Sequence, residues 1–220
     1  MTATTRLAST PTSTGFLIAV EGIDGAGKST QIRALADVLR ALGHEVVVSR
    51  EPTYGQYGKQ LRDSAASGRL TASEEHRLLL LDRREHVDTL IRPALERGAV
   101  VVLDRYYFSS MAYQGAAGLD PETIRRDNEA FAPKPDLLVI FDLPVEEGLK
   151  RIAARGERPN AFEATATLER CRTSFLAMLD LPFAQRVDAT QDADQVRGAL
   201  VAVVLRALGY RRFVGLGAIA

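Results

Sequence analysis

A glycine-rich segment, Gly22-Ile-Asp-Gly-Ala-Gly-Lys-Ser29, carries the strongest chemical signal in the chain, and Thr30 follows it. The segment has the spacing of a phosphate-binding loop, in which glycines let successive backbone N–H groups turn toward one phosphate. In this pattern Lys28 reaches the outer phosphates, and the hydroxyl of Ser29 can ligate Mg²⁺. A helix that starts near Lys28 would also direct its positive end at the phosphates. The segment therefore predicts a nucleotide-binding site.

Two pairs of charged residues stand where apolar, strand-like segments end. Arg50-Glu51 follows one such segment, and Asp104-Arg105 stands at the end of the next. An aspartate that closes a buried strand is placed to hold Mg²⁺, directly or through water, and a neighbouring arginine suits a bidentate phosphate contact. We predict that Arg50 and Arg105 bind phosphate and that Asp104 lies at the metal. A surface ion pair is the alternative for either arginine.

Three arginines, Arg151, Arg155 and Arg158, follow a later strand-like segment, close to a glycine and a proline. Arg151 and Arg155 are four residues apart and would share one face of a helix, which the glycine and proline would then end. A mobile flap that carries arginines can neutralise a transferring phosphoryl group and exclude water from it. We predict a short arginine-bearing lid over about residues 151–163, with an ordinary charged helix end as the alternative.

Short apolar runs alternate along the chain with segments of helical period. The strand-like runs cover residues 16–21, 45–49, 100–104 and 137–142, with a weaker fifth run at 183–188. Several lack polar alternation, which is typical of strands buried on both faces of a parallel sheet. Helical apolar faces lie over residues 32–42, 87–95 and 196–207, each ending near a glycine. This order predicts a three-layer α/β fold, with a five-stranded parallel sheet and helices on both faces.

The composition is that of an ordinary folded domain. Of 220 residues, 46% are hydrophobic and 25% are charged, with 28 Lys and Arg against 28 Asp and Glu. No apolar run approaches the ~20 residues of a membrane span, and a balanced charge does not favour nucleic acid. A single cysteine, Cys171, indicates a reducing compartment, which we expect to be the cytoplasm. We expect one kinase-like domain at 16–209, a disordered segment at 1–15, and a tail of unknown role at 210–220.

The remaining reactive residue types show no catalytic or metal-binding spacing. We expect His44, His76 and His86 to be structural or exposed, and Cys171 to be packed within a helix. The charged run Asp82-Arg83-Arg84-Glu85-His86 fits either a solvated helix face or a functional one. The chemistry is therefore expected at the ends of the strands.

Taken together, the motifs resemble one family. EGIDGAGKST, the SREP segment, DRREHV, DRYYFSSMAYQG and FDLP occur in the order and spacing of bacterial thymidylate kinases. The resemblance covers roughly residues 16–208, and DRYYFSSMAYQG is its most specific part, because phosphate loops occur in many enzyme classes. It implies a nucleoside-monophosphate-kinase fold and an Mg²⁺-dependent transfer of phosphate from ATP to dTMP, giving dTDP for deoxynucleotide synthesis. It also implies a homodimer.

The resemblance further implies roles for individual positions. ATP would be bound by the phosphate loop and the lid helix, through Gly22, Gly25, Ala26, Gly27, Lys28, Ser29, Thr30 and Arg151. The acceptor dTMP would be held at the strand ends and neighbouring helices, by Asp24, Arg50, Glu51, Leu79, Arg83, Arg105, Ser109, Tyr113 and Gln114, with Arg83 at the base. Catalysis would depend on the charged groups nearest the transferred phosphoryl group, Asp24, Lys28, Arg105, Arg155 and Arg158. The metal would lie at Ser29 and Asp104.

Two positions depart from the family pattern. The family usually has a phenylalanine that stacks on thymine, four residues before the arginine at the base, and this chain has Leu79 there. Many bacterial members have Asp-Arg-x-Glu in the lid, where residues 160–163 here read Asn-Ala-Phe-Glu, so Arg158 is the expected substitute. Because Gly25 stands where another subtype has arginine, the lid is the expected source of catalytic arginines. These departures bear on acceptor preference and turnover.

Three other functions remain open on the sequence. A deoxynucleoside kinase would phosphorylate a neutral hydroxyl group and need a carboxylate base, for which Glu51 is the candidate. Another nucleoside monophosphate kinase, or a regulator that binds ATP without transferring phosphate, would also keep the loop, and Leu79 and Ala161 favour such a reading. A monophosphate acceptor, with a second pKa of about 6, is mostly dianionic and needs arginines rather than a strong base.

Overall fold

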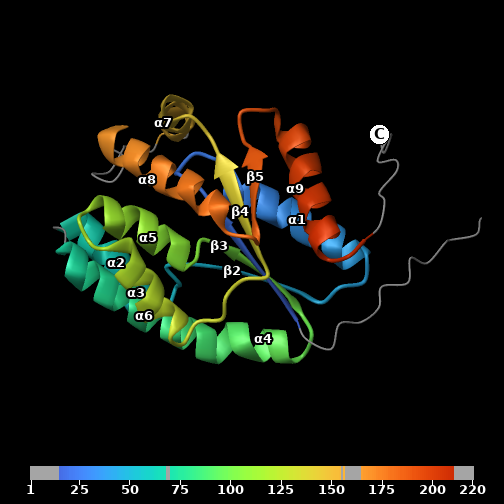
Figure 1. The fold of residues 1–220 in the computed structure, drawn as a ribbon, viewed down its shortest axis with the longest axis horizontal. Helices are drawn as coiled ribbons and strands as arrows, with labels where there is room; N and C mark the ends of the chain where they lie inside the picture. Colours follow the sequence, from blue (N-terminus) through green and yellow to red (C-terminus); the bar gives the residue numbers. More distant parts are fainter. Residues whose placement is uncertain (1–14, 68–69, 155, 157–164, 211–220) are drawn as a thin grey trace, which may run out of the picture.

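The computed structural model, which describes residues 15–67, 70–154, 156 and 165–210, contains one parallel sheet in the order β2-β3-β1-β4-β5 (Figure 1). The strands are β1 (Phe16–Glu21), β2 (Val46–Arg50), β3 (Val100–Asp104), β4 (Leu137–Asp142) and β5 (Ala184–Asp188). The predicted α/β fold with a five-stranded parallel sheet is confirmed, with β2 and β5 each beginning one residue later than expected. Because β1 lies between β3 and β4, the carboxyl end of β1 is the expected ligand position.

The central strands are buried on both faces, which explains their unbroken apolar sequences. Leu17 and Ala19 of β1 belong to one apolar cluster, whereas Ile18 and Val20 belong to the cluster on the other side. Alternate residues of one strand thus fill two separate cores. This double burial fixes the strand ends, and with them the residues that follow, in a rigid frame.

Helices cover both faces of the sheet, as Figure 1 shows. One face is covered by α1 (Lys28–Ala41) and α9 (Ala193–Ala207). The opposite side carries most of the remaining helices: α2 (Gln56–Ser67), α3 (Ala72–His86), η1 (Val87–Ile91), α4 (Arg92–Glu96), α5 (Tyr107–Ala116), α6 (Pro121–Glu129) and α8 (Thr165–Ala177). Two further elements are α7 (Val145–Ala154), after β4, and the short η3 (Met178–Asp180). The predicted helix at 87–95 is therefore the end of a longer helical run that begins with α3.

Helix α3 begins at a capping box. The Thr71 side chain accepts a hydrogen bond from the backbone N–H of Glu74, and the Glu74 side chain accepts one from the backbone N–H of Thr71. Counting by fours from this start, Glu75, Leu79 and Arg83 fall on one face of the helix. The cap thus sets which side chains α3 turns toward α5.

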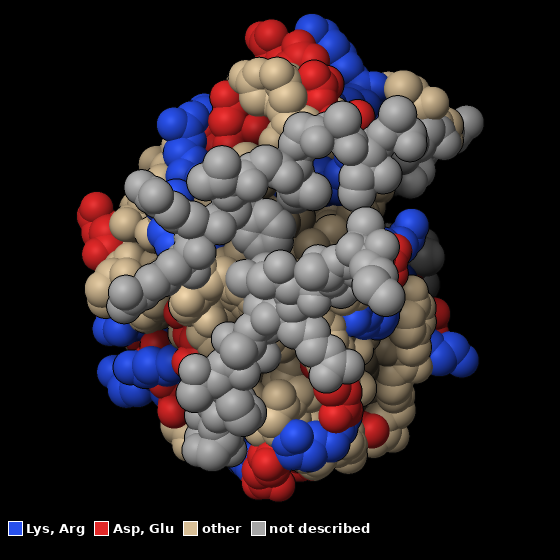
Figure 2. All heavy atoms as spheres, turned by 90° about the vertical axis from the view of Figure 1, so that its right-hand side faces the viewer, with Lys and Arg blue, Asp and Glu red and all other residues tan. Residues whose placement is uncertain are grey.

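The surface carries charges of both signs. On the face beside α1 and α9, Figure 2 shows Lys and Arg interspersed with Asp and Glu wherever grey atoms do not cover it. No helix of the described residues is long and apolar enough to cross a membrane. The predictions for residues 1–14, 211–220 and most of the lid, including Arg155 and Arg158, lie outside the described residues.

Candidate functional site

The glycine-rich loop joins β1 to α1, and its glycines are required by its geometry. Gly22, Gly25 and Gly27 have φ angles of 139°, 83° and 86°, a region that side chains disfavour. A Cβ on Gly22 would lie 2.5 Å from the carbonyl oxygen of Phe141, and one on Gly25 would lie 2.5 Å from that of Gly148. The loop is therefore pressed against the end of β4 and against α7, with the N-terminus of α1 beside it.

The Lys28 side chain is buried and folds back across the loop. Its Nζ donates hydrogen bonds to the carbonyl oxygens of Gly22 (2.9 Å) and Ile23 (2.8 Å). Burial, and then the positive charge of Arg105, lower the pKa of Lys28 to about 8. A desolvated cation of this kind is stabilised strongly when a negatively charged phosphate binds next to it. Lys28 therefore lies within the loop, and its contact with phosphate stays a prediction.

Ser29 and Asp104, the two residues predicted at the metal, are in contact. The Ser29 hydroxyl donates a hydrogen bond to Asp104 Oδ2, which joins the first turn of α1 to the end of β3. The described residues contain no group of three or more His, Cys, Asp or Glu side chains that could hold a metal ion. Mg²⁺ is commonly held by one or two protein oxygens together with substrate phosphates and waters. The pair therefore fits a magnesium ion that arrives with nucleotide phosphates.

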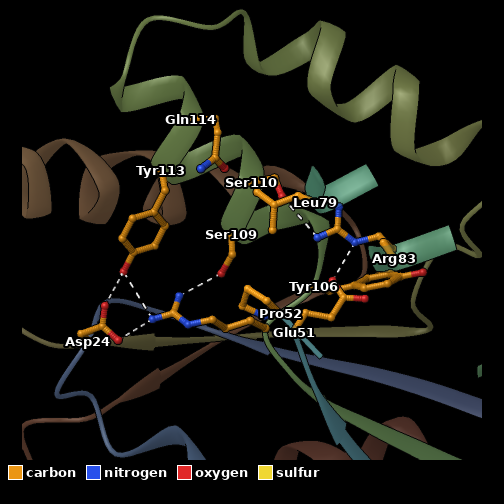
Figure 3. Close-up of a pocket in the computed structure, with 11 residues that line it drawn as sticks. Asp24, Glu51, Pro52, Leu79, Arg83, Tyr106, Ser109, Ser110, Tyr113 and Gln114 are labelled. Carbon is orange, nitrogen blue, oxygen red and sulfur yellow. Dashed lines mark hydrogen bonds and ion pairs between the residues drawn. The ribbon is translucent and has the colours of Figure 1, made fainter. Parts of the chain in front are cut away.

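Arg105 joins the loop to α5 through contacts with Asp24, Ser109 and Tyr113, which are labelled in Figure 3. Its guanidinium pairs with Asp24 at 2.7 Å and donates to Ser109 Oγ at 2.9 Å, while the Tyr113 hydroxyl donates to the other oxygen of Asp24 at 3.2 Å. Burial alone would raise the pKa of Asp24, but the charges of Arg105 and Lys28 lower it to about 2. Arg105 is also the one non-glycine residue with a positive φ (72°) in the part of the chain described. Such strain is typical of functional positions.

Glu21, the last residue of β1, was missed by the sequence analysis. Its buried carboxylate accepts hydrogen bonds from the backbone N–H groups of Tyr106 (2.7 Å) and Ser109 (3.0 Å) and from the Ser109 hydroxyl (2.6 Å). Burial raises the pKa of Glu21, against the lowering effect of the Arg105 charge. Glu21 thus holds the first turn of α5, which carries a partner of Arg105. The sequence did contain a signal for this role, because Glu21, like Asp104, is an acidic residue at the end of a buried strand.

Glu51 is buried and holds Arg83 in place. Its carboxylate accepts hydrogen bonds from Arg83 Nε at 2.7 Å and from His86 Nδ1 at 3.0 Å. Arg83 also donates to Asn128 Oδ1 and to Ser110 Oγ, the latter at 3.2 Å. Both oxygens of Glu51 are therefore engaged by the protein itself. This arrangement does not favour Glu51 as the base of a nucleoside kinase.

The charged run of α3 is only partly solvated. Asp82, Arg83 and His86 are buried, whereas Arg84 and Glu85 are exposed. A purely solvated face, one of the two readings of this run, is therefore wrong. The buried members hold the neighbouring segments, since Asp82 accepts hydrogen bonds from the backbone N–H and hydroxyl of Thr53, at 2.8 and 2.6 Å. His86 is structural, as expected.

A cavity of about 200 Å³ lies beside Arg105, between the strand ends and helices α3 and α5 (Figure 3). Most of the predicted acceptor residues line it: Asp24, Glu51, Leu79, Arg83, Arg105, Ser109, Tyr113 and Gln114. Pro52, Tyr106 and Ser110 line it as well and were missed. A concave site with a few converging polar groups is typical of small-molecule binding.

A second hollow, of about 100 Å³, lies over the loop. It is lined by the loop and by residues at the ends of β2 and β3: Gly25, Gly27, Lys28, Ser29, Thr30, Arg50 and Asp104, together with Asp24 and Arg105. The last two residues also line the first cavity, so the two hollows meet there. Arg50, which was predicted to bind the acceptor, lines only the loop side, where its guanidinium lies 3.5 Å from the Tyr54 hydroxyl. The arrangement can bring two phosphate groups together at Arg105.

The remaining predicted ATP contacts lie around these hollows. Arg151 donates to the carbonyl oxygen of Ala189 at 3.1 Å, and thereby ties α7 to the segment after β5. Ala26 is buried beneath the loop, and Gly22 packs on β4. None of these three lines either hollow, whereas Gly25, Gly27 and Thr30 line the hollow over the loop.

Comparison with known proteins agrees with this geometry. The sequence model described as thymidylate kinase matches residues 20–199. The chain belongs to the thymidylate kinase family. It is 58% identical over 197 residues to a thymidylate kinase of Xanthomonas euvesicatoria pv. vesicatoria (strain 85-10), covering 90% of this chain and 86% of that one. It is 53% identical over 197 residues to a thymidylate kinase of Xylella fastidiosa (strain M12), covering 90% of each chain.

Membership in the thymidylate kinase family confirms the resemblance inferred from the motifs. The match includes the phosphate loop, the ends of β2 and β3, and helices α3 and α5, which build the two hollows. This family match favours a kinase that phosphorylates a nucleoside monophosphate over the two alternatives of a deoxynucleoside kinase and a regulator that binds ATP without transferring phosphate. The engagement of both Glu51 oxygens points the same way.

Proposed function

We propose that this protein transfers the γ-phosphoryl group of ATP to dTMP, giving ADP and dTDP. The observation that carries the proposal is the position of Arg105, which lines both the cavity and the loop hollow and is paired with Asp24. An arginine there can grip the phosphate of a nucleotide in the cavity and face the outer phosphate of a nucleotide on the loop. Family membership supports dTMP as the acceptor, and the phosphate loop supports ATP as the donor.

The acceptor needs positioning more than activation. A nucleoside monophosphate is mostly dianionic at pH 7, so its oxygen can attack without a strong base. Arg105 would bind that phosphate, and Asp24 with Ser109 would hold the guanidinium in the required orientation. Alignment of the attacking oxygen with the γ-phosphorus supplies much of the rate enhancement in such reactions.

The loop stabilises charge on the donor. Lys28 and the N–H groups at the start of α1 would face the negative charge that develops on the transferring group and on the ADP that leaves. Ser29 and Asp104 would hold Mg²⁺, which neutralises phosphate charge when it is bound. Arg50, on the loop side, would contact the same phosphates.

The lid completes the proposal on the donor side. Arg151 sits on α7, three residues after Gly148, through which α7 touches Gly25 of the loop. We propose that Arg155 and Arg158, farther along the chain, reach the transferring phosphoryl group when the site closes. This rests on the family resemblance and on the charge that phosphoryl transfer must neutralise.

We also propose that the enzyme is a homodimer in the cytoplasm, on the strength of the family resemblance alone. Size-exclusion chromatography with light scattering tests the first of these points. A mass near 48 kDa, roughly twice the 24.0 kDa of the chain, would support it, and a mass near 24 kDa would contradict it.

Measurement of ADP release with dTMP or thymidine as acceptor tests the proposed reaction. We expect dTMP-dependent ADP formation, no turnover with thymidine, and loss of at least ~10²-fold in rate in Lys28→Ala, because one charged contact to the transferring group is worth several kcal/mol. Exposed Lys150→Ala is the matched control, since Lys150 is paired with Glu147 on the surface of α7. Normal activity of Lys28→Ala would refute the assignment of the loop.

A further inference from the structure

Gln114, on α5, lines the acceptor cavity, and the oxygen of its amide is buried without a hydrogen-bond partner among the described residues. In Figure 3 the amide group of Gln114 is turned toward the side of the cavity where Ser110 and Leu79 lie. Gln114 is only 5% exposed, so its unbonded oxygen lies inside the protein rather than in bulk solvent. A buried acceptor left in this state is destabilising, and a ligand that donates a hydrogen bond to it would remove that penalty.

The nitrogen of the same amide is directed at a buried acid. Gln114 Nε2 donates a hydrogen bond of 3.4 Å to Glu75 Oε2, and Glu75 is 8% exposed on the first turns of α3. An ionised carboxylate can only accept hydrogen bonds. Glu75 therefore selects the amide orientation in which the NH₂ group faces α3 and the oxygen is left for the ligand.

We propose that Glu75 makes the cavity selective for a pyrimidine with an N–H at ring position 3, by fixing the orientation of the Gln114 amide. Thymine and uracil offer a carbonyl acceptor at position 4 beside the N3–H donor. Arg83, which carries only donors, lines the cavity with Gln114, whose oxygen accepts. Cytosine offers the reverse order, an amino donor beside a ring acceptor, and would leave both protein groups unmatched. This inference rests on the proposed function and adds the positioning residue that sets its base preference.

The consequence is a selectivity that depends on a residue which need not touch the base. A site built to bond a donor rejects an analogue that lacks it far more strongly than an apolar pocket can. If the amide were free to turn over, its NH₂ group could donate to N3 of cytosine, and only the mismatch at Arg83 would remain. Removal of Glu75 as an acceptor should therefore change the ratio of the activity with dTMP to the activity with dCMP, and not only the total activity.

The test is Glu75→Gln, assayed with dTMP and dCMP as acceptors at saturating ATP. The new amide can donate or accept, so it no longer selects one orientation of Gln114. We expect the ratio of kcat/KM for dTMP to that for dCMP to fall at least tenfold, through a higher KM for dTMP and a lower KM for dCMP. The KM for ATP should not change. Glu85→Gln, an exposed change of the same kind on α3, should keep the wild-type ratio.

A ratio that stays within twofold of wild type would overturn the inference, whether or not total activity falls. Glu75→Met, which removes the acceptor but keeps the length of the side chain, should lower the ratio in the same way. If circular dichroism showed both variants unfolded, an NMR experiment on the wild-type enzyme would test the inference instead. The N3 imino proton of dTMP bound to the wild-type enzyme should lie close to the Gln114 side chain, and lack of that contact would refute the inference. Absence of wild-type activity on dTMP would instead contradict the proposed function.

Discussion

Replacement of Arg105 with alanine should impair use of dTMP far more than binding of ATP. The Arg105 side chain is 14% exposed, is paired with Asp24 at 2.7 Å and is bonded to Ser109 at 2.9 Å, so it is held in one orientation. A charge-assisted hydrogen bond contributes about 1.5–3 kcal/mol, which corresponds to roughly 10- to 150-fold in kcat/KM for dTMP. We expect the loss toward the upper end, because Asp24 would then face the acceptor phosphate without its paired guanidinium.

Steady-state kinetics with each nucleotide varied in turn measure this effect. Arg105→Lys keeps the charge but not the forked donor geometry, and should recover only part of the lost activity. Arg125→Ala removes an exposed arginine paired with Glu122 on α6, and should leave both constants unchanged. If Arg105→Ala raised the KM for ATP and left that for dTMP unchanged, Arg105 would belong to the donor, and the two hollows would have been assigned in reverse.

Three further predictions concern residues around Arg105. Because burial lowers the pKa of Lys28 to about 8 in the free enzyme, kcat/KM for ATP should fall as pH rises above about 8; a profile flat to pH 10 would contradict this. Glu51→Gln should lower the free energy of unfolding by about 3–5 kcal/mol, because it leaves buried Arg83 without its carboxylate, while Glu85→Gln should change it little; denaturant unfolding measures both. Leu79→Phe should lower the KM for dTMP several-fold, since stacking adds about 0.5–1.5 kcal/mol; unchanged kinetics with dTMP, dUMP and a purine monophosphate would mean that position 79 does not face the base.

Much of the fold could be read from the strands. Runs such as Leu137–Asp142 are apolar at successive positions because both faces of the sheet are covered, and that pattern predicts a parallel sheet directly. The helical run from α3 to α4 was harder to predict. Its inner face mixes Glu75, Asp82 and His86 with apolar residues, so the periodic apolar signal began only at Val87.

The residues of the site likewise fall into those that could be predicted from the sequence and those that could not. The glycine loop and the charged residues at the end of β3, Asp104 and Arg105, carry their chemistry in their spacing and were singled out from the sequence, whereas the ion pair between Asp24 and Arg105 was not predicted. The supporting contacts join segments that are far apart in the chain, as with Arg83 and Asn128, or Glu21 and Ser109. Only the folded arrangement brings these groups together, and a buried acid such as Glu21 or Glu75 looks like any other acid in the sequence.

The central claim is phosphoryl transfer from ATP to dTMP, and one experiment tests it most directly. Purified enzyme with MgATP would be given each common nucleoside monophosphate and thymidine in turn, and ADP release would be measured together with the phosphorylated product. We predict that dTMP is the best acceptor, that one dTDP forms for each ADP, and that thymidine gives no product. Faster turnover of thymidine, or of a purine monophosphate, than of dTMP would contradict the account.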